Sequence, residues 1–180
     1  MTPSHQPTLT IDLGAITQNW QKLNGLSTLG SAAVIKANAY GLGMEACGVA
    51  LRDAGATRFF VATLDEGRAL RETLGEKPWI GVLEGLSEVA AFQKHALTPV
   101  LNTLEQVQGW RGQTDVVIHL DTGMNRLGLL PSELAEAASS DTWKTARTAL
   151  LMSHLTSAEE PSNPANQAQL ARFKAGMATA

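Results

Sequence analysis

The sequence predicts an α/β protein whose fold is an incomplete (β/α)8 barrel of the TIM type, with about six βα units. Short apolar runs alternate with amphipathic segments, and the spacing between runs is mostly near twenty residues. Parallel strands need such helical crossovers, so this rhythm indicates repeated βα units. No GxGxxG follows the first run, and polar clusters follow several different runs. These two features favour a barrel over an open doubly wound sheet, which has one ligand crevice.

Each element follows from its local pattern. A strand-like LTIDL at 9–13 opens the chain, and Asp12 is placed to cap a helix with Ile16 and Trp20 on one face. The predicted barrel strands are 32–35, 58–62, 78–83, 98–101, 115–120 and 149–155. The predicted helices that separate and follow them are 44–55, 64–75, 87–96, 103–110, 131–138 and 166–180. A closed barrel needs eight strands, so six units predict an unclosed barrel with two free edges that favour association into a homo-oligomer.

Composition excludes several classes of protein. The chain has 180 residues, 44% hydrophobic residues and a net charge of −3, which suits a globular domain and argues against nucleic-acid binding. No apolar run is long enough for a membrane span, and the N-terminus does not resemble a signal peptide. The single cysteine, Cys47, fits a small buried residue in a reducing compartment, so we expect a cytoplasmic protein. No HxH, HExxH or Cys/His cluster predicts a metal site.

Lys36 raises the main chemical question, because it follows an apolar strand at the rim where barrel enzymes keep their active sites. Apolar surroundings favour a neutral amine, which can form a Schiff base with a carbonyl compound. By position alone, a lysine that extends from a strand end into solvent is the commoner case. The next residues, Asn38, Tyr40, Gly41 and Gly43, form a polar loop before a helix, which suits a phosphate but also an ordinary turn.

Three further side chains follow other strands on the same predicted rim. Arg126 lies in a glycine-containing turn and could bind a carboxylate or phenolate, while Asp121 is expected to orient that loop. His154 ends the sixth strand, and Leu83 ends the third, where it could pack against a flat group. Each of these residues alone fits an ordinary surface or core role. Together with Lys36 they support a functional site more strongly, because all of them follow strands and share one rim.

Three segments resemble one known family. AVIKANAYGLG, LDTGMNRLG and MSHLTSAEE are similar to characteristic blocks of the alanine racemases, which are pyridoxal 5'-phosphate enzymes of fold type III. They occur in the family's order and span most of the chain, and the first block is highly specific.

The resemblance implies a role for each residue. Lys36 would bind pyridoxal phosphate as a Schiff base and act as one of two racemising bases. Tyr40 would reach the phosphate, and Leu83 and His154 would line the pyridine ring. Arg126 would contact the phenolic oxygen and the carboxylate of the substrate, alanine. Residues 1–13 would then be the remnant of a separate β-domain, and 14–180 a partial barrel that binds the cofactor, in a protein that forms a dimer.

The sequence departs from the family in two ways. His119 stands where the family often has a carboxylated lysine that orients the arginine, although a neutral imidazole can still accept a hydrogen bond. The resemblance also covers roughly the first half of a family member, without the tyrosine base on the opposite face. We therefore expect little or no racemase activity from this chain alone. The alternatives are a fold type III racemase or decarboxylase of another amino acid, and a non-catalytic, pyridoxal-phosphate-binding or self-assembling half-barrel.

Overall fold

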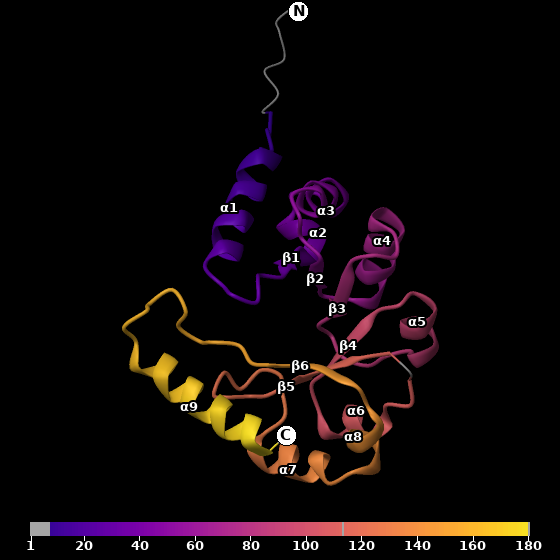
Figure 1. The fold of residues 1–180 in the computed structure, drawn as a ribbon, viewed down its shortest axis with the longest axis vertical. Coiled ribbons are helices and arrows are strands. Elements are labelled where there is room, and N and C mark those ends of the chain that lie inside the picture. The colour runs from indigo at the N-terminus through magenta and orange to yellow at the C-terminus, as the bar shows by residue number, and fades with distance from the viewer. Residues whose placement is uncertain (1–7, 113, 180) are drawn as a thin grey trace, which may run out of the picture.

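The protein is a curled sheet of six parallel strands covered by helices on its outer side, as the computed structural model shows for residues 8–112 and 114–179 (Figure 1). The strands pair in chain order, and each pairs in parallel with the next. They are β1 (Ala33–Val34), β2 (Arg58–Val61), β3 (Trp79–Val82), β4 (Thr98–Leu101), β5 (Val116–His119) and β6 (Thr148–Met152). The predicted incomplete barrel is confirmed.

The helices follow one another around this arc, with α1 and α9 at its two ends (Figure 1). They are α1 (Leu13–Gly25), α2 (Lys36–Tyr40), α3 (Met44–Asp53), α4 (Leu64–Leu74), α5 (Val89–Lys94), α6 (Leu104–Gly109), α7 (Pro131–Ala138), α8 (Asp141–Thr145) and α9 (Pro164–Thr179). Within the described ranges, none of them combines the length and apolar character needed to cross a lipid bilayer.

Alternation along the strands divides the apolar residues between two layers, because successive side chains point to opposite faces. Phe59, Ile80 and Ile118 belong to the large core between sheet and helices. Phe60 and Val117 belong to a small cluster on the other, concave face. His119 lies two positions after Val117, so it shares the concave face at the carboxyl end of β5.

The concave face is packed by aromatic rings below the strand ends. The rings of Phe60 and Trp79 meet edge to face, with centroids 5.1 Å apart and an interplanar angle of 76°. Gly81 makes this packing possible, since a Cβ at that position would lie 2.6 Å from the Phe60 ring. The concave face of the sheet is therefore apolar below the polar residues at the strand ends.

Capping residues explain where several helices begin. The Asp12 side chain accepts from the Ala15 amide at 3.0 Å, which confirms its predicted capping role at α1. Thr63 and Thr103 cap α4 and α6 in the same way, at 3.2 Å each. These caps lie two residues after β2 and β4, and they stabilise the connection between each strand and the helix that follows it.

The local structure corrects three expectations. Residues 8–12 form no strand and Leu13 already belongs to α1, because no neighbouring chain segment pairs with LTIDL. The segment 32–35 is not buried throughout: β1 has two residues, and Val34 is 43% exposed at the edge of the sheet. β6 ends at Met152, two residues before His154. Within the described ranges, β1 and β6 each pair on one side only, as predicted for an unclosed barrel.

Candidate active site

A pocket of about 540 Å³ opens at the carboxyl ends of the strands. Its lining includes all five side chains that the sequence analysis selected, together with His119. The five are Lys36, Tyr40, Leu83, Arg126 and His154. Lys36 therefore faces the same space as Arg126 and His154, and the roles assigned to the five residues stay predictions.

The backbone around Lys36 has an unexpected conformation. Ala37, Asn38, Ala39 and Tyr40 all have positive φ angles, between 51° and 56°, so α2 is a left-handed helical turn. Residues other than glycine rarely adopt this conformation, which costs roughly 1–2 kcal/mol each. The sequence predicted a tight polar loop here but not its handedness. Such strain is often found where a functional side chain must point in one direction.

Few side-chain contacts hold this turn. The Asn38 side-chain oxygen accepts from the Met44 amide at 2.8 Å, which ties the turn to the first residue of α3. Glu66 accepts from the Asn38 amide at 3.3 Å, reaching across from α4. Tyr40 is 63% exposed, so its hydroxyl is available at the pocket rim. Lys36 itself is half-buried.

Asp121 shapes the loop that carries Arg126. One of its carboxylate oxygens accepts from the amides of Gly123, Met124 and Asn125 at 2.8, 2.9 and 3.1 Å. Burial alone would raise the pKa of Asp121, but these backbone amides and nearby His119 outweigh it and lower the pKa. The predicted role of Asp121 as a loop-orienting residue is confirmed by these contacts.

His154 is held through its backbone by a buried glutamine of α9. Gln169 is 2% exposed, and its amide nitrogen donates to the His154 carbonyl at 2.9 Å and to the Thr122 hydroxyl at 3.0 Å. Its amide oxygen accepts from the Thr156 amide and hydroxyl at 2.9 and 3.0 Å. All four contacts join α9 to the segments after β5 and β6. Partial burial, Arg126 and Lys36 lower the pKa of His154, which favours a neutral ring at pH 7.

His119 is a buried pocket residue whose ring is hydrogen-bonded and whose pKa is shifted by its neighbours. It is 7% exposed, and its Nδ1 lies 2.8 Å from the side-chain oxygen of Asn102, which follows β4. Burial is the main cause that lowers the pKa of His119, and His154 and Arg126 add to it against the opposing effect of Asp121. The ring is therefore neutral at pH 7.

Asn102 and Gln169 were missed by the sequence analysis. Asn102 could have been found, since it follows the fourth strand at the same rim as the selected residues. Gln169 gave no such signal, because a glutamine in a helical pattern is ordinarily exposed. Its burial depends on α9 packing over the strand ends.

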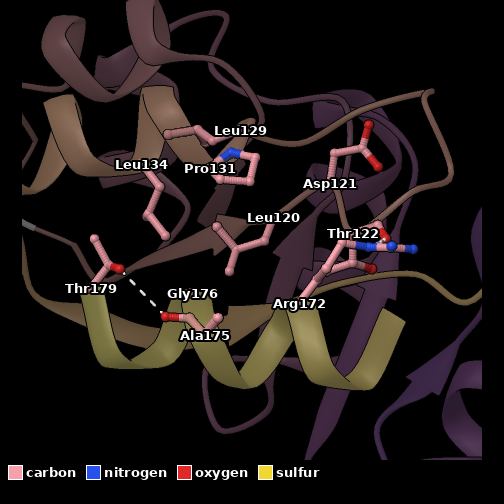
Figure 2. A pocket seen from close by; sticks show the side chains of 10 residues that line it. All are labelled: Leu120, Asp121, Thr122, Leu129, Pro131, Leu134, Arg172, Ala175, Gly176 and Thr179. Carbon is pink, nitrogen blue, oxygen red and sulfur yellow. Dashed lines mark hydrogen bonds between the residues drawn. The ribbon is translucent and has the colours of Figure 1, made fainter. Parts of the chain in front are cut away.

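A second, smaller pocket of about 140 Å³ lies beneath α9 (Figure 2). Leu120 and Leu134 approach the helix there, and a Cβ on Gly176 would lie 2.6 Å from Leu120. Arg172 reaches from α9 to the carbonyl of Thr122. This pocket shows how closely α9 packs on α7 and on the segment that follows β5, and it contains none of the five selected residues.

The chemistry of the larger pocket suits an anionic carbonyl compound. Lys36 supplies an amine, and Arg126 supplies a permanent cation with bidentate geometry. Apolar side chains, among them Leu83 and Met152, line the walls. Within the described part of the chain, no group of three His, Cys, Asp or Glu side chains could hold a metal ion.

A parallel half-barrel with a lysine and an arginine at the carboxyl ends of its strands defines a barrel protein that can bind a carbonyl compound through an amine. Residues 11–180 match the family described as "Alanine racemase, N-terminal domain". The chain belongs to this family.

Relatives and solved structures agree with this assignment. The chain is 45% identical to an alanine racemase of Cereibacter sphaeroides, over 93% of this chain and 50% of that protein. It is 42% identical to an alanine racemase of Jannaschia, over 93% of this chain and 49% of that protein. The chain thus spans about half the length of these curated relatives.

Among solved structures, an alanine racemase from Bartonella henselae with covalently bound pyridoxal phosphate has a TM-score of 0.87 and 33% identity. That likeness covers 94% of this chain and 52% of the other. A histidine racemase from Leuconostoc mesenteroides has a TM-score of 0.71 and 26% identity, over 90% of this chain and 46% of the other.

Proposed function

We propose that this chain is the part of an alanine racemase that binds pyridoxal phosphate, with Lys36 as the residue that links to the cofactor. The observation that carries the proposal is the single pocket that brings Lys36 together with Tyr40, Arg126 and His154. Family membership supports it, as does the Bartonella henselae structure, which contains covalently bound pyridoxal phosphate.

The residues present fit this cofactor. A pocket of about 540 Å³ has room for a substituted pyridine ring, and Leu83 offers an apolar surface beside it. Half-buried Lys36 offers an amine that suits the aldehyde, and exposed Tyr40 offers a hydroxyl that suits the phosphate. When bound, pyridoxal phosphate supplies an electron sink that acidifies the Cα–H bond of an amino acid.

The remaining roles belong to the chain's own side chains. Arg126 would bind the substrate carboxylate and the phenolic oxygen, because its guanidinium is always charged. His154, whose lowered pKa keeps the ring neutral, would line the ring without adding charge. Lys36 Nζ would take or return the proton at Cα from one face.

We further propose that the 180-residue chain racemises alanine slowly or not at all by itself. Two-base racemisation needs a second base on the opposite face, and the chain's one tyrosine, Tyr40, is assigned to the phosphate. Residues 1–13 would be the remnant of a β-domain, of which 1–7 lie outside the described residues, and 14–180 the partial barrel. A cytoplasmic location, with a dimer as the working form, completes the proposal.

Cofactor binding tests the central claim. Pyridoxal phosphate added to the purified chain should give the absorbance of a Schiff base with lysine. Borohydride should then reduce this bond and leave the cofactor permanently attached to the peptide that contains Lys36. The Lys36→Ala variant should lose this absorbance almost completely, whereas Lys22→Ala, at an exposed position of α1, should keep it. A label on another lysine, or no absorbance, would refute the assignment.

A second candidate is a racemase for a different amino acid, which the likeness to the histidine racemase supports. A panel of L-amino acids tested with the chain for any formation of the D-isomers would separate the two, since an alanine racemase should prefer alanine. Ordinary turnover of alanine by the 180-residue chain would contradict the expected low activity.

A third candidate is a non-catalytic half-barrel that assembles by its edges. The one-sided pairing of β1 and β6 in the described structure supports this candidate. Light scattering tests association, and a stable monomer would argue against it.

A further inference from the structure

Glu66, in the first turn of α4, connects two of the strand ends that surround the pocket. Its Oε2 accepts from the Ala62 amide at 2.7 Å, directly after β2. Its Oε1 accepts from the Asn38 amide at 3.3 Å, in the left-handed turn that follows β1 and carries Lys36. One half-buried carboxylate therefore joins the ends of two neighbouring strands.

The Asn38 amide needs an acceptor from outside its own turn. The hydrogen bonds of the left-handed turn begin at the Ala39 amide, which donates to the Ile35 carbonyl at 2.9 Å. The Asn38 amide lies one residue earlier, among the amides that a helical turn leaves free at its start. Within residues 8–112 and 114–179, the side-chain hydrogen bond that reaches residues 37–40 from another helix or strand comes from Glu66. The carboxylate thus caps this turn from α4.

A second helix of the same chain provides an internal comparison. The segments TLDE at 63–66 and TLEQ at 103–106 contain the starts of α4 and α6, and the threonine of each caps its helix. Gln106 takes the place of Glu66 in the second segment, and its amide oxygen accepts from the Asn102 amide at 2.7 Å, directly after β4. A glutamine side chain has one oxygen, whereas a carboxylate has two. One acceptor is therefore enough for such a helix start, and the second oxygen of Glu66 serves the left-handed turn.

The conformation of this turn decides the direction of two pocket residues. Lys36 and Tyr40 lie at its ends, and both line the pocket. Residues 37–40 are not glycines, so their left-handed conformation costs free energy and needs contacts that stabilise it. Glu66 does not line the pocket, so it can act on a ligand there only through the turn.

We propose that Glu66 is a positioning residue, whose Oε1 holds the turn of α2 in the left-handed conformation and so directs Lys36 into the pocket. Its Oε2 supports the start of α4, as Gln106 supports the start of α6. The benefit for pyridoxal phosphate rests on the proposed function, but the effect of Glu66 on the turn does not.

The Glu66→Gln variant separates the two oxygens. Its single oxygen should stay with the Ala62 amide, because that contact is shorter and less exposed than the contact to Asn38. The new NH₂ group would then face the Asn38 amide, and two donors cannot form a hydrogen bond. The start of α4 keeps its contact, and the left-handed turn loses its cap.

Nuclear magnetic resonance of the ¹⁵N-labelled 180-residue chain tests the turn without any ligand. A positive φ brings the amide proton close to the Hα of the same residue, so residues 37–40 should show strong nuclear Overhauser effects between these protons. The effects should weaken in Glu66→Gln. Glu72→Gln removes the same charge from an exposed position of α4 and should leave them unchanged. Unchanged effects in Glu66→Gln would overturn the proposal.

Binding of pyridoxal phosphate tests the consequence for Lys36. Glu66→Gln should bind the cofactor about tenfold more weakly, as expected for the loss of one hydrogen bond to a charged group, with less Schiff-base absorbance at equal concentration. Thr103→Ala removes the cap of α6, so it should lower the unfolding temperature but keep the affinity within about twofold. Equal weakening by Glu66→Gln and Thr103→Ala would mean that a general loss of stability explains the effect, and would refute the positioning role.

A second substitution in the turn gives a rescue test. Ala37→Gly makes the left-handed conformation easier to adopt, so Ala37→Gly combined with Glu66→Gln should bind within about threefold of the parent chain. A double variant that binds as weakly as Glu66→Gln would show that Glu66 does not act through the turn. If neither the parent chain nor any variant binds pyridoxal phosphate, the proposed function fails. The Overhauser effects then still decide whether Glu66 holds the turn.

Discussion

Two regions of the pocket place their functional side chains by different physical means. The lysine turn, residues 36–43, is shaped mainly by its backbone, with four consecutive residues in the left-handed conformation. The arginine–histidine rim, residues 119–127 and 152–156, is shaped by polar side chains that bind backbone groups. The first region holds its conformation against local preference, and the second holds it through contacts between distant segments.

This difference shows where each region is vulnerable. The lysine turn is strained at every residue from Ala37 to Tyr40, so relieving strain there should stabilise the fold. In the rim, the side-chain amide of Gln169 and the hydroxyl of Thr122 have hydrogen-bond partners for both donor and acceptor groups. Ser153 donates to the Leu120 carbonyl at 2.8 Å, so the Thr122 hydroxyl donates to Ser153 and accepts from Gln169. Removing one member of that network leaves several partners unsatisfied.

The largest effect should come from breaking the rim at Gln169. Gln169→Leu removes four hydrogen bonds from a buried position and should lower the free energy of unfolding by about 3 kcal/mol. Urea unfolding followed by circular dichroism measures it. Gln167→Leu, on an exposed position of the same helix, is the matched control and should change stability by at most about 0.5 kcal/mol. Equal effects from the two variants would show that the network does not hold the rim.

A smaller loss should follow from Asp121→Ala, which removes the acceptor for three backbone amides. We expect the free energy of unfolding to fall by about 2 kcal/mol, because the carboxylate is partly exposed. The stability of Asp121→Asn should lie between that of Asp121→Ala and that of the parent chain.

The same residue predicts a pH dependence. A carboxyl whose pKa is lowered in the folded state stabilises it above the unfolded pKa, and this contribution is lost as pH falls through the folded pKa. Below about pH 4, the ordinary range for aspartate, the parent chain should lose stability more steeply than Asp121→Ala. Urea unfolding at pH 7 and pH 3 measures both slopes, and identical slopes would contradict the role of the carboxylate.

The smallest effect, and one of opposite sign, is expected in the lysine turn. Ala37 is exposed with φ at 51°, so Ala37→Gly should relieve strain and stabilise the chain by about 1 kcal/mol. Ala69→Gly makes the same chemical change at an exposed position inside right-handed helix α4 and should destabilise by about 1 kcal/mol. Thermal unfolding compares the pair. Destabilisation by both would mean that the turn is not strained at Ala37.

Much of the fold could be predicted from the sequence, because strand and helix periodicities are local. All six predicted strands occur, and 98–101 matches β4 at both ends. The strand-like 9–13 failed, since a strand also needs a neighbour to pair with. The left-handed turn was missed, because alanine at 37 and 39 gives no sign of positive φ. Asn38 is the one residue of that turn with a known tendency toward it.

The sequence by itself determined the order of the βα units and, to within three residues, where each strand ends. That was enough to place Lys36, Leu83, Arg126 and His154 at one rim, since parallel strands end on the same side. Only the tertiary structure decided how these side chains are held. The partners of His119 and His154 lie 17 and 15 positions away in the chain, at Asn102 and Gln169. A periodic pattern records which face a residue occupies, but hydrogen bonds between separate segments exist only after the segments have packed.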